Sequence, residues 1–457
     1  MRQTVHDQLR LTPVPIAHAH ALELQTMSAT LEALPEVVKW VHDDLIRRAG
    51  KRIDPKKGRR GMTAEQVLRA LIVKQMNGFS YEQLAFHLAD SSSYRAFCRL
   101  GFDEEAPKKS RLQSNIKRVR ALTWERINHE LVRYAAALHV ETGQTVRADC
   151  TVVESNIHHP TDSSLLWDCV RVLVRWQARA QEMFGVNFTN HKRRARRRAL
   201  GVLNAKSDAQ RLPLYRDLLK VTEASVSSAK SVTTALGELK FADLAAMLQA
   251  ATIADQLRNY CKLAQRVIEQ TRRRVLLGEQ VPASEKVVSI FEPHTDIIVK
   301  DRRQTLYGHK ICLTSGVSGL VTDVVVEEGN PADSTLAVKM IERHCERFGK
   351  APRQVSFDGG FASKANLAEL KALGVQDVAF SKHLGLSVTD MVKSSWVYKR
   401  LRNFRAGIEG TISFVKRIFG LDRCAWSGFA SFRAYVHGSV LACNLLVLAR
   451  HLLASPA

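Results

Sequence analysis

Three carboxylates in this chain occur where two strands and a helix could bring them together. Asp149 lies in a run that alternates with a period of two, Asp358 follows a short β-rich run, and Glu409 falls in a stretch with helical spacing. Three carboxylates from separate elements can bind two divalent ions about 3.5–4 Å apart. Their hard oxygens suit Mg²⁺, which completes its shell with waters and substrate phosphates. The pattern makes two-metal phosphoryl transfer a candidate chemistry.

Two cations accompany the third carboxylate. Arg405 precedes Glu409 by four residues and Lys416 follows it by seven, so all three share one face if this stretch is a helix. Arginine binds phosphate through its planar fork, and lysine binds it as a point charge. We therefore expect Arg405 and Lys416 to hold a phosphate backbone beside the metal ions.

Spacing alone leaves other interpretations of these residues open. Asp358 could cap a turn at the end of its strand, and Glu409 could form a helical ion pair with Arg405. Five further carboxylates compete for the same role: Glu154, Asp296, Asp301, Asp323 and Asp333.

The charge of the chain narrows the class of partner. Its 457 residues include 68 Lys and Arg against 45 Asp and Glu, which is a formal net charge of +23. Hydrophobic residues make up 45%, enough to fill a sizeable core, and this excludes wholesale disorder. Such an excess of positive charge favours a polyanionic partner, with nucleic acid ahead of a membrane surface.

The cysteines and the apolar stretches indicate a compartment. None of the eight cysteines forms a Cys-x-x-Cys pair, which argues against a structural zinc site and a secreted disulfide framework. Residues 1–26 lack the apolar core of a signal peptide. The most apolar stretch, residues 440–453, is too short and too polar to span a bilayer. We expect a soluble, reduced, cytoplasmic protein that is not associated with a membrane.

The first part of the chain, residues 1–140, has helical patterns. Three expected helices start with capping boxes at Thr63, Ser80 and Ser110, each followed three residues later by Gln. The first two of these helices, joined by a Gly turn, fit either a helix-turn-helix or an ordinary corner of a helical bundle. Basic pairs beside them favour phosphate contacts: Lys51-Arg52, Lys56-Lys57, Arg59-Arg60 and Lys108-Lys109.

Strands and a basic helical segment follow. In the expected strand 145–153, Asp149 lies on the face opposite Val146, Ala148 and Cys150. Residues 161–284 are helical in pattern and contain six cations within residues 192–198, a run that repels itself unless a polyanion is present. Strands are then expected at 286–291, 306–314, 321–327, 353–357 and 378–380, with helices at 334–348 and 364–373 and a helical C-terminus. Residues 315–319, which include two glycines, are expected to join 306–314 and 321–327 as a hairpin loop.

Three features near these elements have two interpretations each. His309-Lys310 could place a cation near the carboxylates, although an exposed polar pair on a hairpin is favoured. Trp426 could stack on a base, although packing is favoured because aromatic residues are mostly found in cores. Cys150 could be a nucleophile, but its place on the strand face opposite Asp149 favours a buried apolar role.

The chain resembles bacterial insertion-sequence transposases with an Asp-Asp-Glu triad, and among them the ISNCY-like group. The strongest similarity lies at residues 402–424, where Arg405, Glu409 and Lys416 match a Tyr-Arg-Glu-Lys signature and Arg402 stands in the Tyr position. Weaker similarities are the segments around Asp149 and Asp358 and the helical pattern of residues 62–116.

The resemblance implies a mixed α/β fold with a ribonuclease H-like core. An all-helical domain of residues 1–140 is expected to bind element ends. Residues 141–160 with 285–457 are expected to form the catalytic domain. The basic helical insertion, residues 161–284, follows the first core strand and is expected to grip flanking DNA.

The resemblance also implies the activity: Mg²⁺-dependent strand cleavage and strand transfer at insertion-sequence ends. Asp149, Asp358 and Glu409 would be the catalytic residues and would bind two Mg²⁺ ions, with Mn²⁺ as a substitute. The partner is double-stranded DNA, at the element ends and the target, bound by a homodimer. Two alternatives stay open: a non-catalytic DNA-binding protein derived from such an enzyme, and a plain ribonuclease H-like nuclease. DNA contacts are expected from Arg402, Arg405, Lys416, Arg193, Arg194 and Arg197.

Overall fold

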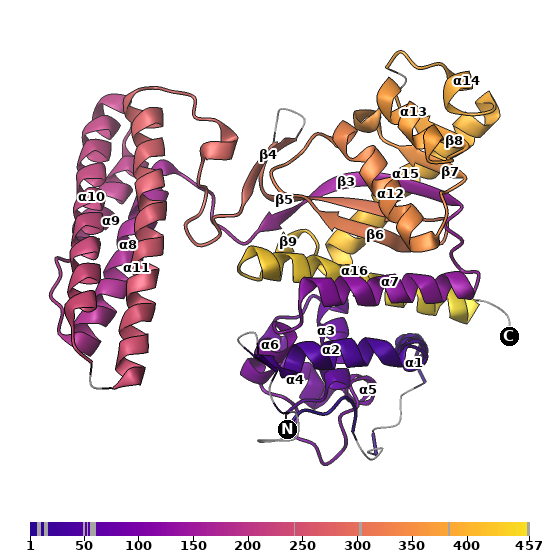
Figure 1. Ribbon diagram of the computed structural model, residues 1–457, viewed down its shortest axis with the longest axis horizontal. Helices are drawn as coiled ribbons and strands as arrows, with labels where there is room; N and C mark the ends of the chain where they lie inside the picture. Colours follow the sequence, from indigo (N-terminus) through magenta and orange to yellow (C-terminus); the bar gives the residue numbers. More distant parts are fainter. Residues whose placement is uncertain are drawn as a thin grey trace. The chain divides into compact units, whose positions relative to one another are not determined.

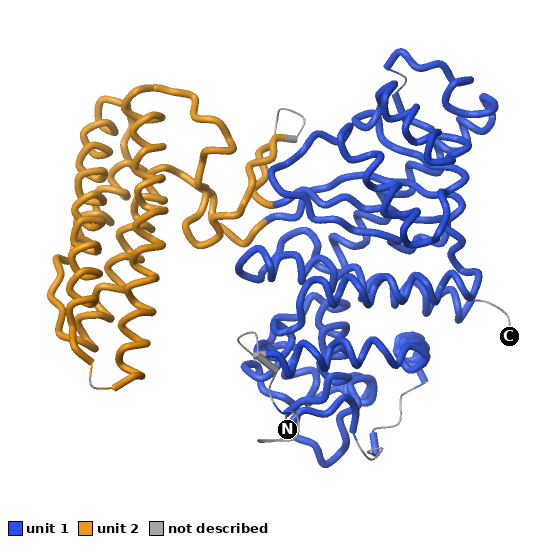
Figure 2. The backbone as a smooth tube through the Cα atoms, viewed as in Figure 1, with its two compact units in different colours: residues 1–154, 309–457 blue, residues 155–308 orange. Residues whose placement is uncertain are grey.

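The chain divides into two compact units (Figure 2). Unit 1 comprises residues 1–154 and 309–457, and unit 2 comprises residues 155–308. Expected features at Lys56, Lys57, Arg59, Arg60 and Asp301 lie outside the described residues. The computed structural model describes residues 1–6, 11–12, 17–48, 51–52, 54, 61–241, 243–300, 304–382 and 384–454.

Unit 1 begins with helices. The expected capping boxes of Thr63 and Ser80 are confirmed, since each side chain and its Gln partner satisfy backbone N–H groups at a helix start. The box at Ser110 is wrong, because that helix begins at Lys109 and Ser110 is its second residue, while Lys108 at the N-cap makes no side-chain cap. The helices are α1 (Ala19–Glu32), α2 (Pro35–Ile46), α3 (Ala64–Met76), α4 (Tyr81–Asp90), α5 (Ser92–Phe97), α6 (Lys109–Ile116) and α7 (Ala121–Ala137), with a two-residue antiparallel pair β1 (Arg47–Arg48) and β2 (Lys51–Arg52).

A mixed seven-stranded sheet follows (Figure 1). Its order is β4-β5-β3-β7-β8, with β6 also paired to β5 and β9 to β3. The expected hairpin is confirmed, since β5 and β6 are antiparallel, while β3, β7 and β8 run parallel. The strands are β3 (Thr145–Ser155), β4 (Asp296–Lys300), β5 (Gln304–Ser315), β6 (Val321–Val326), β7 (Gln354–Phe357), β8 (Asp377–Phe380) and β9 (Arg423–Cys424).

The C-terminal helices of unit 1 enclose two cores. One core joins β7 and β8 to α12 and α15, and the other joins the N-terminal helices to α16. Each side of the sheet thereby gains an apolar layer, which is the arrangement that buries both faces of parallel strands. These elements are η3 (Asp333–Thr335), α12 (Ala337–Phe348), η4 (Gly359–Phe361), α13 (Lys364–Ala372), α14 (Val388–Met391), α15 (Ser395–Phe419) and α16 (Phe429–Ala454).

The apolar C-terminal stretch is longer than residues 440–453. It forms the 26-residue helix α16, which is long and apolar enough to cross a bilayer by length and composition, so the expectation that it is too short is wrong. Its residues are mostly buried, and it packs against α1, α3, α7 and β6. A mostly buried helix of this kind is typical of a protein core, and its apolar character is explained by these contacts.

Unit 2 is a bundle of four helices with a short hairpin at its end. The expected strand 286–291 is wrong. The side-chain amide of Gln270 accepts from the backbone N–H of Val287 and donates to its carbonyl, so these groups have no need of a neighbouring strand. The side chains of Val287 and Ile290 pack into the bundle instead. The elements are α8 (Asp162–Phe184), α9 (Lys192–Asn204), α10 (Asp208–Glu238), α11 (Leu244–Thr271), η1 (Arg272–Leu276), η2 (Ala283–Glu285) and β4.

Candidate active site

Strand register brings the first two carboxylates together. β3 and β7 are parallel, and Ala148 is paired with Phe357. The next residues along the two strands are Asp149 and Asp358, so these side chains leave neighbouring strands at the same level, about 4.8 Å apart in the backbone. β7 ends at this point, and Asp358 is the N-cap residue of the short helix η4.

Helix α15 supplies the third carboxylate. It begins after Ser394, whose hydroxyl accepts from the N–H of Val397, and it ends at Gly420 in the left-handed conformation. The expected helix at residues 405–416 is thus part of a 25-residue helix that packs against β7 and β8. Arg405 and Glu409 are one turn apart on it.

Arg405 contacts all three carboxylates. Its guanidinium Nη2 lies 3.2 Å from Oδ2 of Asp149 and 3.3 Å from Oδ1 of Asp358, while Nη1 lies 3.2 Å from Oε1 of Glu409. The expected helical ion pair between Arg405 and Glu409 is therefore present, but it is one of three contacts. Asp149 and Glu409 are more than 250 positions apart in the sequence, yet both contact this guanidinium. A divalent ion in the same place could reach all three carboxylates.

The two aspartates have different electrostatic environments. Burial raises the pKa of Asp149, and the neighbouring charge of Asp358 adds to this, against opposition from Arg405 and the N–H of Cys150. Burial also disfavours the charge of Asp358, but the hydroxyl of Ser381, the N–H of Gly359 and Arg405 outweigh it and lower the pKa of Asp358. The ionised form of Asp358 is thus favoured by its own neighbours, whereas the ionised form of Asp149 is stabilised most by a nearby cation.

Arg147 positions α15, although it was not among the site residues expected from the sequence. It lies two residues before Asp149 on the same strand face, and its Nη1 donates to the carbonyl of Phe404 at 2.9 Å. Its Nη2 donates to the hydroxyl of Thr411 at 3.4 Å. A Cβ atom at Gly407 would collide with the Arg147 guanidinium, so only glycine admits this contact. The alternation that placed Asp149 on one face was the available signal for Arg147.

The other cations expected beside the triad lie apart from its carboxylates. Arg402 is exposed on α15. Lys416 lies 3.6 Å from Asp422 beyond the helix end, and its side chain is 23% exposed. Among the competing carboxylates, Asp333 pairs with Lys310 at 2.8 Å. Glu154 is five positions from Asp149 on β3, an odd spacing that directs it to the opposite face.

The cations of α9 divide into two groups. Arg194 and Arg198 form ion pairs with Asp217 of α10, so they attach α9 to its neighbour. Arg193 and Arg197 instead line an open hollow of about 700 Å³ together with Lys192, Arg196, Asn190 and Leu200. The second group is the one available to an anionic partner.

Three minor expectations have clear outcomes. His309-Lys310 is not an exposed pair: His309 is buried beside Phe429 and Phe432, and Lys310 is bonded to Asp333. The packing role of Trp426 is confirmed, since its side chain is only 4% exposed. Cys150 is partly buried against the apolar core of β7 and α12, and burial contributes to raising the pKa of its thiol after the larger effect of Cys312.

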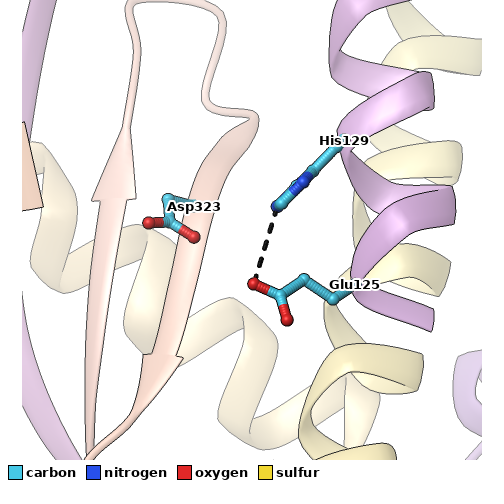
Figure 3. Close-up of side chains that lie close together, drawn as sticks. All are labelled: Glu125, His129 and Asp323. Carbon is cyan, nitrogen blue, oxygen red and sulfur yellow. Dashed lines mark ion pairs between the residues drawn. The ribbon is translucent and has the colours of Figure 1, made fainter. Parts of the chain in front are cut away.

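A second cluster of ligand-type side chains lies elsewhere in unit 1. Glu125 and His129 on α7 face Asp323 on β6 (Figure 3). Arg343 lies 2.8 Å from Glu125 and 2.6 Å from Asp323, and Arg347 pairs with both carboxylates as well. Arg343 and Arg347 thus neutralise the two carboxylates, and a metal ion would have to displace both arginines. The cluster fits a buried ion-pair network that links α7, β6 and α12.

This network is expected to stabilise the fold. Burial opposes the charge of Asp323, but Arg343 and Arg347 outweigh it and lower the pKa of this carboxyl. Its contribution to stability is therefore present at neutral pH and is lost as the pH falls through the lowered value. We expect Asp323→Asn to reduce the free energy of unfolding by about 3 kcal/mol, measured by urea denaturation, and to leave metal affinity unchanged. An unaltered unfolding midpoint together with reduced metal binding would contradict this assignment.

Two family models match the chain. A model described as "Transposase DDE domain" matches residues 299–445, and one described as "Transposase domain (DUF772)" matches residues 20–118. The chain belongs to the insertion-sequence transposases of the DDE type. The first match contains Asp358, Arg405 and Glu409, whereas Asp149 lies outside both. Transposases of this type generally use divalent metal ions. Searches of curated proteins and of solved structures found no significant match.

Proposed function

We propose that this transposase cleaves and joins DNA strands at the ends of its insertion sequence by two-metal phosphoryl transfer at Asp149, Asp358 and Glu409. The observation that supports this most is the convergence of the three carboxylates on the Arg405 guanidinium at 3.2–3.3 Å. Three hard oxygen donors from β3, the end of β7 and α15 suit Mg²⁺, or Mn²⁺ in its place.

The residues around the triad have separate tasks in this proposal. Bound ions would activate the attacking water or 3′-hydroxyl and stabilise the leaving oxygen. The Ser381 hydroxyl and the Cys150 N–H, at 2.7 and 2.8 Å, fix the orientation of one oxygen on Asp358 and Asp149, respectively. The side chain of Arg405 is 17% exposed, so its guanidinium would also donate to a phosphate oxygen of a bound strand.

The order of the strands supports a ribonuclease H-like core as part of the proposal. β3 is central, the antiparallel β5 and β6 lie on one side, and the parallel β7 and β8 lie on the other. Unit 2 enters the chain directly after β3, as expected for a helical insertion after the first core strand. The further division of unit 1 into a DNA-end domain, residues 1–140, and a catalytic domain stays a prediction.

The test is a cleavage and joining assay with DNA that carries the element ends. With Mg²⁺ we expect nicked and then joined products, and with EDTA neither. Nicks without joined products would support the plain nuclease, and DNA binding without nicks would support the non-catalytic binder.

We further propose that a homodimer handles two ends on the bacterial chromosome in the cytoplasm. Cross-linking of the protein on DNA would detect this dimer.

The hollow of α9 provides a prediction about DNA affinity. Arg193 and Arg197 line it, whereas Arg194 is already paired with Asp217. Each phosphate contact releases counterions, so the double variant Arg193→Ala/Arg197→Ala should lower the slope of log affinity against log salt by about 2. Arg194→Ala is the matched control and should change the slope less. Fluorescence anisotropy at several salt concentrations measures both; equal slopes in all three proteins would contradict the prediction.

A further inference from the structure

A second basic hollow lies at the start of α15. Its volume is about 480 Å³, within the range of pockets that take small molecules. The first residues of β3 and β7 border it, and the first three turns of α15 form one wall. Arg353, Lys393 and Arg400 line it, and no Asp or Glu is among its described lining residues. We call it the Trp396 hollow, and its charge suits an anion.

Trp396 distinguishes this hollow from an ordinary basic patch. Its side chain is 67% exposed, whereas every other tryptophan of the chain is buried or partly buried. The guanidinium carbon of Arg400, one turn later, lies 5.1 Å from the ring centroid, and Arg400 also donates to Oε1 of Gln354 at 2.5 Å. The indole is therefore held by a cation–π contact while most of its surface faces solvent.

The hollow and the triad share one helix. Trp396 precedes Arg405 by nine residues, which is about 13 Å along α15. This corresponds to about four base-pair steps of duplex DNA. Phe404 also lines the hollow, and its carbonyl accepts from Arg147, the residue that positions α15. Nine residues also turn an α-helix by about 180°, so a DNA strand that leaves the triad would reach the hollow by passing around α15 as well as along it.

We propose that the Trp396 hollow binds an unpaired nucleotide of the DNA strand, with the base stacked on the indole and the phosphate held by the three cations. The inference rests on the proposed function for its DNA substrate. A paired duplex presents phosphates but keeps its base faces stacked, so it would use the cations and leave the indole in water. An unpaired base has a free π-face, and base–aromatic stacking is tolerant of sequence.

The test compares two short single strands in EDTA: an oligothymidylate and an abasic strand of the same length. Wild-type protein should bind the oligothymidylate about tenfold more tightly, and binding should quench tryptophan fluorescence. Trp396→Ala should remove the preference, and Trp396→Phe should retain most of it. Leu384→Ala, which removes another exposed apolar side chain (65% exposed) outside the hollow and outside the expected DNA-end domain, is the control and should behave as wild type.

Three results would overturn the proposal. The wild type could bind the two strands with equal affinity, Trp396→Ala could keep the preference for the oligothymidylate, or Trp396→Ala could weaken binding of both strands by the same factor. An acidic peptide that binds as tightly as the oligothymidylate would overturn it as well. Because EDTA removes divalent ions, these affinities do not depend on metal binding at the triad. A failure of the hollow and a failure of the catalytic assignment are therefore separate results.

Discussion

Replacing Asp149 by Asn is expected to lower Mg²⁺-dependent strand cleavage by about 10³-fold or more. Asn keeps the shape of the side chain but loses the charge and one hard oxygen ligand. Metal ions contribute several kcal/mol to a phosphoryl transfer, and each 1.36 kcal/mol is a factor of ten in rate. Asp149 is the most buried of the three carboxylates, with 15% of its side chain exposed, so water replaces a lost ligand least easily there.

The matched control for this variant is Glu154→Gln. Glu154 is a carboxylate on the same strand, on the opposite face from Asp149, and its neutralisation should leave cleavage within about twofold of wild type. DNA affinity in EDTA should be the same for both variants. Cleavage that survives in Asp149→Asn, Asp358→Asn and Glu409→Gln would reject the site, and equal loss in Glu154→Gln would show that the effect is not specific to the triad.

Replacing Arg405 by Ala is expected to change metal affinity and cleavage in opposite directions. The guanidinium donates to the same carboxylates that a metal ion would use, so cation and metal repel each other. Without it, Mn²⁺ affinity in the absence of DNA should rise about tenfold, measured by electron paramagnetic resonance. Cleavage should nevertheless fall about 100-fold, since a preorganised donor to the phosphate is lost.

Arg402→Ala is the control for this second prediction. Arg402 lies on the same helix and is exposed, so its removal should leave Mn²⁺ affinity unchanged while lowering DNA affinity. If Arg405→Ala instead weakened Mn²⁺ binding, the main role of Arg405 would be to hold the carboxylates together, and the competition between cation and metal would be rejected.

Local patterns in the sequence predicted local structure well. The capping boxes of Thr63 and Ser80 and the hairpin of β5 and β6 depend on residues a few positions apart, so neighbouring residues contain the information. The box at Ser110 failed because the helix there starts at Lys109, two residues before Arg111, the expected first helical position. Helix ends fray, so a local pattern specifies the first residue of a helix less strongly than the helix itself.

The sequence predicted the structure less well where it depends on contacts with residues far away in the chain. Residues 286–291 have β propensity but form no strand, because Gln270 of α11 satisfies the backbone of Val287 and the bundle core takes its side chain. His309 looked exposed on a hairpin, yet α16 covers it with Phe429 and Phe432. Strand propensity reflects packing against neighbours, which a single segment does not contain.

The sequence by itself determined the chemical identities proposed for the site: three carboxylates, the cation Arg405 beside one of them, and a basic chain suited to DNA. The spacing of Arg405 and Glu409 on one helix was also readable, because four residues make one turn. Only the tertiary structure decided which carboxylates meet. The register of β3 against β7 puts Asp149 beside Asp358, and the Arg147 contact at Gly407 brings α15 close enough for Arg405 to reach all three. Register and helix docking are set by packing between segments far apart in the chain, so no local pattern could specify them.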